Sequence, residues 1–442
     1  MNKKVLFLLF GLLWLTVSCD LANNIIPSQE AESTPESSAV ETAVIPNNPV
    51  PETTPDIAIP TAAVTQTQPT LRIWLPPEIA LSSEEGAAIL NSQLAAYRTN
   101  HPDIEIIVEQ KSISGQSGIL NYLRTGRTVA PTILPDLIAI PIDQLGPALS
   151  EELIYPIDGL IETSLLEDLY PAALELVLKD SQLSGYPFVL TGLPHLAYNS
   201  ETVTETIPTS WEPFINLPNT LVFPANGLPG GTLGLQLYLA AGGTLVNEVE
   251  QVTLQFEPLV IALQQLELAE NSGFILGQSS NYSSLEESWQ QFQAGTADFA
   301  ITNSEQYLRL RDAEGIFLVT AVPGLQQPLT PLVSGWAWAM STADPAQREL
   351  AAELLASLIA SDQLGEWSFA SNFLPARKEA FTFWPEDDPY VIFAKEQLTL
   401  AGAMPTSNSN IMTALNNAVF DVVTQAKTPQ AAAQDALAAL QP

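Results

Sequence analysis

The chain has 442 residues, with 15 lysines and arginines against 49 aspartates and glutamates, which gives a formal net charge of −34. This acidic excess disfavours nucleic acid and anionic membrane surfaces as partners, because both would repel the protein. Charged residues make up only 14% of the chain and apolar residues 46%, so the composition is that of a globular protein and excludes a purely acidic disordered tail.

The N-terminal segment has the pattern of a secretory signal peptide. Lys3 and Lys4 precede the apolar run Val5–Val17, and the small residue Ser18 follows it. The run is too short to span a bilayer, which requires about 20 residues. Together with Cys19, the end of the segment resembles the lipobox of bacterial lipoproteins. That resemblance implies cleavage after residue 18, acylation of Cys19 and a lipid anchor on the extracytoplasmic face of the cell membrane. Ordinary secretion with an incidental cysteine is the alternative.

Residues 19–69 are predicted to form a disordered tether. They are rich in Pro, Ser, Thr and Glu and contain no aromatic residue, so they cannot bury enough apolar surface to fold. As a flexible coil the tether would reach roughly 40 Å, and as stiff polyproline II about 150 Å. We expect it to lift a folded part, beginning near residue 71, off the membrane.

Strands and helices are predicted to alternate from Thr70 onward. Apolar runs rich in β-branched residues predict strands at 70–75, 104–108, 135–140, 186–190 and 297–302. Between the first two runs, apolar residues recur at helical spacing, so a parallel βαβ unit is expected there. Three helix starts carry N-cap residues with capping-box partners. These pairs are Ser82 with Glu85, Ser284 with Glu287, and Asp344 with Gln347.

Nine phrases occur in a characteristic order across residues 71–442, and together they resemble the family 1 extracellular solute-binding proteins of ABC transporters. The phrases are "LAAYRTNHPDIEIIV", "LPDLIAI", "LIYPIDGLI", "YPFVLTGLPHLAYN", "PTSWEPF", "LYLAAGGTL", "SWQQFQAGTADFAI", "VPGLQQPLTPLVSGWAWAM" and "DPAQRELAAELLASLIASDQLGEW" continued by "LPARKEAF".

The resemblance implies an α/β fold with two lobes, of the type II periplasmic-binding-protein kind, in which mixed sheets are flanked by helices and a ligand cleft lies between the lobes. It implies crossovers near Leu190–Leu193, Gly335 and Pro375. The N-lobe would comprise residues 71–190 and 336–375, and the C-lobe residues 191–335 and 376–442. The implied function is capture of a small solute by hinge closure and its delivery to the permease subunits of a transporter.

Members of this family commonly bind sugars, whose apolar faces suit aromatic rings and whose hydroxyls suit polar side chains. For each candidate residue, a purely structural role such as core packing or loop capping is the alternative. The candidate ligand-binding residues are Trp74, Asp143, His195, Asn303, Glu305, Tyr307, Trp336 and Trp338. The segment 407–419 has no tryptophan where a maltose-binding member stacks a sugar, which disfavours maltodextrin itself and leaves other saccharides open.

No catalytic, metal-binding or cofactor motif is recognised, and the sequence predicts a monomer that is not an enzyme and needs no cofactor. Two other classes stay open. A sensor or adhesion lipoprotein would bind a ligand but need no permease. A surface hydrolase is conceivable because the 49 acidic residues contain every spacing that a glycosidase carboxylate pair requires.

Overall fold

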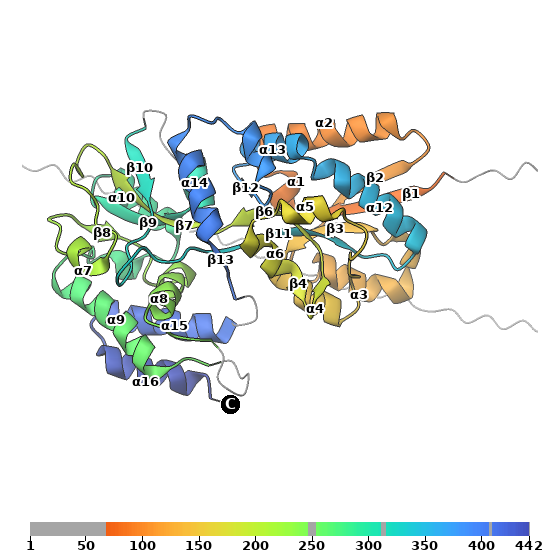
Figure 1. Cartoon of the computed structure of the whole chain (residues 1–442). Helices are drawn as coiled ribbons and strands as arrows, with labels where there is room; N and C mark the ends of the chain where they lie inside the picture. Colours follow the sequence, from red (N-terminus) through yellow and green to blue (C-terminus); the bar gives the residue numbers. More distant parts are fainter. Residues whose placement is uncertain (1–67, 246–252, 311–314, 406–408, 442) are drawn as a thin grey trace, which may run out of the picture. The chain divides into compact units, whose positions relative to one another are not determined.

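The computed structural model describes residues 68–245, 253–310, 315–405 and 409–441 (Figure 1). The predicted signal peptide, Cys19 and almost all of the tether lie outside these ranges. Within them, no helix combines the length and the apolar character that a membrane span requires.

The larger of two main sheets has the strand order β12-β6-β11-β3-β1-β2, and β13 pairs with β11 (Figure 1). Strand β1 is parallel to β2 and β3, which confirms the predicted βαβ unit. Strand β11 lies antiparallel between β3 and β6, so the sheet is mixed. The strands are β1 (Thr70–Leu75), β2 (Glu105–Gln110), β3 (Leu137–Pro141), β6 (Tyr186–Thr191), β11 (Leu332–Met340), β12 (Leu374–Pro375) and β13 (Gly402–Ala403).

Helices pack on this sheet because its strands are apolar on both faces. In β3, Leu137, Ile138, Ala139 and Ile140 are all fully buried, as expected of a strand that is covered on both sides. The elements in this part of the chain are α1 (Pro77–Ala80), α2 (Glu84–Asn100), α3 (Ile119–Val129), α4 (Leu145–Ser150), α5 (Thr163–Glu167), α6 (Pro171–Val177), the hairpin β4 (Leu178–Lys179) and β5 (Gln182–Leu183), α12 (Pro345–Leu358) and α13 (Ser361–Ala370).

The smaller sheet has the order β10-β7-β9-β8 and its own hydrophobic core, in which Trp211, Phe214 and Phe299 are fully buried. Its strands are β7 (Pro194–Asn199), β8 (Leu221–Val222), β9 (Phe299–Asn303) and β10 (Phe317–Thr320). The helices in this part of the chain are α7 (Trp211–Phe214), α8 (Leu228–Ala240), α9 (Phe256–Asn271), α10 (Leu285–Gln293), α11 (Ser304–Leu310), α14 (Pro389–Leu400), α15 (Ser409–Val423) and α16 (Pro429–Ala439).

One of the three predicted capping boxes is confirmed. Ser284 accepts a hydrogen bond from the Glu287 amide, and the Glu287 carboxylate accepts one from the Ser284 amide. The other two predictions were wrong in part. Helix α2 is capped by Ser83, while the hydroxyl of Ser82 donates instead to that of Ser371. Asp344 does cap α12, but its amide donates to Thr342, so Gln347 does not complete a box.

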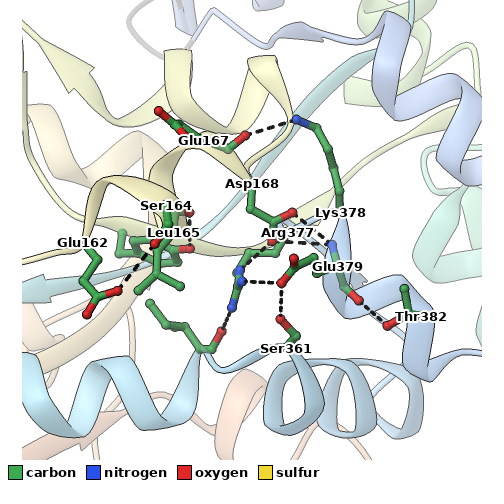
Figure 2. A network of polar contacts seen from close by, with 12 residues as sticks. Glu162, Ser164, Leu165, Glu167, Asp168, Ser361, Arg377, Lys378, Glu379 and Thr382 are labelled. Atoms are coloured by element: carbon green, nitrogen blue, oxygen red, sulfur yellow. Dashed lines mark hydrogen bonds and ion pairs between the residues drawn. The ribbon is translucent and has the colours of Figure 1, made fainter.

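A buried arginine connects three segments beside the larger sheet (Figure 2). Arg377, whose side chain is 4% exposed, donates from Nε to the Asp168 carboxylate at 2.8 Å and from Nη1 to the carbonyl of Ile359. Its third contact is the carboxylate of Glu379, at 3.3 Å. Asp168 also accepts from the Glu379 amide at 3.1 Å, so both buried charges are hydrogen-bonded. The network fixes the chain just after β12.

Replacing Arg377 with methionine is expected to lower the free energy of unfolding by about 3–5 kcal/mol, because a largely buried Asp168 carboxylate would lose its cation. Urea unfolding followed by circular dichroism measures this loss. The matched control is Arg124→Met, which breaks an exposed ion pair with Glu151 and should leave stability nearly unchanged. Equal effects of the two substitutions would contradict a structural role for the Arg377 network.

Candidate functional site

The carboxyl ends of three parallel strands meet at one edge of the larger sheet. Trp74 is the second-last residue of β1, Lys111 follows β2 directly, and Asp143 follows β3 by two residues. Ligands of open α/β sheets bind outside the carboxyl ends of the strands, so a ligand site is expected at this edge.

A groove of about 700 Å³ lies beside the end of β3. Asp143 is its one predicted ligand residue, and its carboxylate is exposed. The groove combines charged and hydroxyl groups with apolar surface, which is the mixture that a sugar requires. We call it the β3 groove, and its lining includes Asp143, Leu145, Pro147, Ser150, Glu175, Lys179, Ser184 and Met404.

Trp74 lies at the same edge but inside the core, with 3% of its surface exposed. Its indole nitrogen donates to the Glu109 carboxylate at 2.7 Å. Tyr122 meets the indole edge-on at 6.1 Å between ring centroids and is itself 40% exposed. The ammonium of Lys111 lies 5.2 Å from the Trp74 ring and 5.5 Å from the Tyr122 ring, within the range of cation–π attraction. Tyr122 and Lys111 therefore present an aromatic face and a cation at the surface above Trp74.

His195 is fully buried and lies among aromatic rings close to the link between the two sheets. Its ring is 5.5–5.7 Å from those of Tyr307, Tyr390 and Phe393. Nδ1 lies 3.2 Å from the carbonyl oxygen of Leu193, which can only accept, so Nδ1 carries the proton. Nε2 has no hydrogen-bond partner among the described residues. Burial lowers the pKa of His195 to about 3, with partial opposition from the Leu193 contact, so the ring is neutral at physiological pH.

The turn from β9 into α11 holds three of the candidates. Asn303 accepts a hydrogen bond from the Gln306 amide at 3.0 Å. The partly buried Glu305 carboxylate accepts from Ser304 at 2.8 Å and from the backbone amide of Gly192 at 2.9 and 3.0 Å. Burial raises the pKa of Glu305, and these hydrogen bonds oppose the rise. Tyr307 is 5% exposed, and its hydroxyl donates to the carbonyl of Phe317 at 2.8 Å.

Trp336 and Trp338 share one face of β11, as their alternation predicts. Trp338 packs against Phe188 at 5.1 Å between ring centroids. Trp336 pairs in register with Pro141 at the end of β3 and is 9% exposed. Neither residue lines the β3 groove.

The structure therefore brings only some of the predicted residues together. His195 and Tyr307 are in ring contact with each other, and Glu305 is bonded to the nearby Gly192. Asp143 and Trp74 lie elsewhere, at the edge of the larger sheet.

Lys111, Tyr122, Lys179 and Ser184 were missed by the sequence analysis. The position of Lys111 directly after a strand was a signal that could have found it, but the exposure of Tyr122 depends on how α3 packs.

Among the described residues, no group of histidine, cysteine and acidic side chains could hold a metal ion.

Comparisons with known proteins agree with this fold. The model of the bacterial extracellular solute-binding protein family matches residues 92–392. The chain belongs to this family. No curated protein sequence matches this solute-binding protein. Its fold is the two-lobe α/β fold of the type II periplasmic binding proteins, as the resemblance implied.

Three solved structures illustrate the fold of this solute-binding protein, each at an identity too low to show more than the fold. The cyclic α-maltosyl-1,6-maltose binding protein of Arthrobacter globiformis is 17% identical, with 84% of this chain and 97% of that one covered and a TM-score of 0.69. The sugar-binding protein MalE of Xanthomonas citri is 18% identical, with coverages of 83% and 95% and a TM-score of 0.67. The GacH receptor of Streptomyces glaucescens is 16% identical, with coverages of 85% and 98% and a TM-score of 0.63.

The buried neutral His195 predicts a pH dependence of the stability of this solute-binding protein. Below pH 6.5 the unfolded chain binds a proton at this position while the folded chain, with a pKa of about 3, does not. Stability is therefore lost as the pH falls from about 6.5 toward 3, by up to about 1.4 kcal/mol per pH unit. Urea unfolding at pH 6.5 and 4.5 is expected to show a loss smaller by about 2 kcal/mol in His195→Gln than in the unmodified protein. Equal losses would show that His195 is protonated in the folded state.

Proposed function

We propose that this solute-binding protein captures a saccharide at the carboxyl edge of the larger sheet and delivers it to the permease subunits of an ABC transporter. Three proteins of similar fold support the ligand class, because they bind or are bound to cyclic α-maltosyl-1,6-maltose, a sugar and acarbose. A sensor or adhesion protein that shares the fold is the second candidate, and it differs in needing no permease.

The chemistry of the β3 groove is the observation that carries the proposal. A carboxylate such as that of Asp143 accepts two or more hydrogen bonds from adjacent sugar hydroxyls. Ser150 and Lys179 add donors in the same groove, and Leu145, Pro147 and Met404 supply apolar surface for the CH face of a pyranose ring. The groove is of the size expected of a small-molecule site, about 300–1,000 Å³.

The aromatic part of the site is proposed to lie around Tyr122. Its ring is the most exposed of the aromatic groups at this edge, and Trp74 fixes it from below. Trp74 would then support ligand binding mainly by positioning Tyr122 and Lys111, and less by touching the ligand itself. Two further residues keep their proposed ligand roles. They are Trp336, which pairs with Pro141 at the end of β3, and Asn303, at the end of β9. Tyr307, His195 and Trp338 would need to move out of their buried surroundings to reach a sugar.

Capture is proposed to occur by hinge closure between a lobe built on the larger sheet and a lobe built on the smaller one, with the residue ranges predicted from the sequence. A ligand that touches both lobes only in the closed state shifts the population toward that state. A shift from 1:99 to 99:1 requires about 5.5 kcal/mol of preference for the closed state. The protein is proposed to act as a monomer on the extracytoplasmic face of the membrane, where acylated Cys19 anchors it.

Replacing Asp143 with asparagine is expected to weaken about tenfold the binding of the most tightly bound member of a panel of neutral oligosaccharides, because a charged acceptor becomes a neutral amide; tenfold corresponds to about 1.4 kcal/mol. Isothermal titration calorimetry measures the change. Asp362→Asn on α13 is the matched control, because this exposed aspartate does not line the β3 groove. An unchanged affinity in Asp143→Asn would remove Asp143 from the site.

Binding without chemistry separates this proposal from a hydrolase. A panel of neutral oligosaccharides is expected to give saturable changes in tryptophan fluorescence, and the sugars should be recovered intact after overnight incubation. Chromatography of the recovered sugars measures turnover. Loss of substrate with time would favour the hydrolase, and no saturable signal with any saccharide would end the proposal of a sugar receptor.

The lipid anchor is tested independently of the ligand. The full chain expressed in a bacterium is expected to partition into the detergent phase of Triton X-114, because several acyl chains, each worth about 0.8 kcal/mol per buried CH₂, give stable membrane binding. Cys19→Ser should move the protein to the aqueous phase, and Ser18→Ala should not. Detergent partitioning of Cys19→Ser equal to that of the unmodified chain would contradict the anchor.

A further inference from the structure

The first crossover between the two sheets is bonded differently on its two sides. Up to Thr191 the backbone belongs to the larger sheet, where Thr191 pairs with Ser334 and Leu190 pairs with both Gly335 and Leu374. From Pro194 onward it belongs to the smaller sheet, where Pro194 pairs with Asn303. Only Gly192 and Leu193 lie between these strands.

Both linking residues are bonded to the smaller sheet's side. The Gly192 amide donates to the two carboxylate oxygens of Glu305, at 2.9 and 3.0 Å. The Leu193 carbonyl accepts from the Ser304 amide at 3.0 Å and from Nδ1 of His195 at 3.2 Å. Leu193, His195 and Ser304 are fully buried, so this attachment is rigid.

We propose that Glu305 is a positioning residue that clamps Gly192 to helix α11 and so confines the pivot of this crossover to Thr191. The peptide plane between Thr191 and Gly192 is fixed to the smaller sheet by the Gly192 amide, while the amide side of Thr191 is fixed to the larger sheet. Rotation about the two backbone bonds of Thr191, N–Cα and Cα–C, is then the backbone motion that this crossover offers. Without the clamp, rotation about the two backbone bonds of Gly192 would also contribute to the motion between the two sheets.

The conformation of Gly192 supports this role. Its φ is +75°, a region in which residues with a side chain are strained, and a Cβ placed there would meet no atom within 4 Å. Space therefore does not require a glycine at this position. The positive φ requires a glycine there, and this backbone conformation directs the Gly192 amide at the Glu305 carboxylate.

The clamp rests on the proposed hinge closure, in which it would act, but its test needs no ligand. A failed sugar titration and a failed test of the clamp are therefore separate results. Hydrogen exchange of the full chain, followed by mass spectrometry, measures protection of the segment 191–196. In Glu305→Gln and in Glu305→Asp, which withdraws the carboxylate by one methylene, exchange of the Gly192 amide is expected to be about tenfold faster, equivalent to about 1.4 kcal/mol.

Glu287→Gln is the matched control. Glu287 also accepts two backbone amides, from Ser283 and Ser284 at the start of α10, but it does not touch the crossover. This control reports the cost of losing such a carboxylate within the same part of the fold. Exchange of the segment 191–196 in both Glu305 variants no faster than in Glu287→Gln would overturn the clamp.

A second readout separates a clamp from a merely structural residue. Spin labels at Glu349→Cys on α12 and Glu257→Cys on α9, in the full chain carrying Cys19→Ser, report the distance between the two parts of the fold by pulsed electron paramagnetic resonance. Glu305→Gln is expected to broaden the distance distribution without ligand, and Glu287→Gln is expected to leave it unchanged. An unchanged width in Glu305→Gln would show that the pivot does not depend on Glu305.

Discussion

Strand β11 satisfies the backbone of both β3 and β6, and the larger sheet depends on that pairing. Trp336–Met340 pair with β3 on one side, and Ser334–Trp338 pair with β6 on the other. Without β11, each of those strands would carry a row of unpaired amides and carbonyls in the protein interior, where an unmade hydrogen bond costs more than a made one contributes. The segment that forms the smaller sheet is therefore an insertion between two parts of the larger one, and the chain has to cross between them more than once.

The candidate residues fall into two groups at different places in the fold. Asp143, Lys111 and Trp74 lie at the edge where three parallel strands end, while Glu305 and His195 lie where the first crossover enters the smaller sheet. These two groups have different chemistry. The first combines the exposed Asp143 and the partly exposed Lys111 with the buried Trp74; the second lies among aromatic rings and backbone contacts. Glu305 and His195 were grouped with the ligand residues on sequence grounds, and the proposed clamp would give Glu305 a different role.

Much of the fold was predictable because its signals are local. The β-branched runs at 70–75 and 135–140 and the cap at Ser284 depend on neighbouring residues alone, and they were located to within a few positions. Ser82 was mistaken for the cap of α2 because Ser82 and Ser83 both precede the same helix. Their contacts distinguish them, since Ser83 accepts from the Gly86 amide and Ser82 donates to Ser371. The site was harder, because exposure is a property of the packed molecule. Trp74 was predicted to contact a ligand and Tyr122 was not singled out, yet Trp74 is 3% and Tyr122 40% exposed.

The register of the larger sheet has a kinetic consequence. Leu190 pairs with Leu374, and Ala139 pairs with Trp338, so residues nearly two hundred positions apart are neighbours in one sheet. Contacts of such long sequence separation form only after a large loss of chain entropy, and proteins rich in them fold slowly. During synthesis, β3 and β6 emerge long before β11 exists to pair with them. The nascent chain thus remains without its central strand until most of its length has been made, so the larger sheet cannot be completed until late in synthesis.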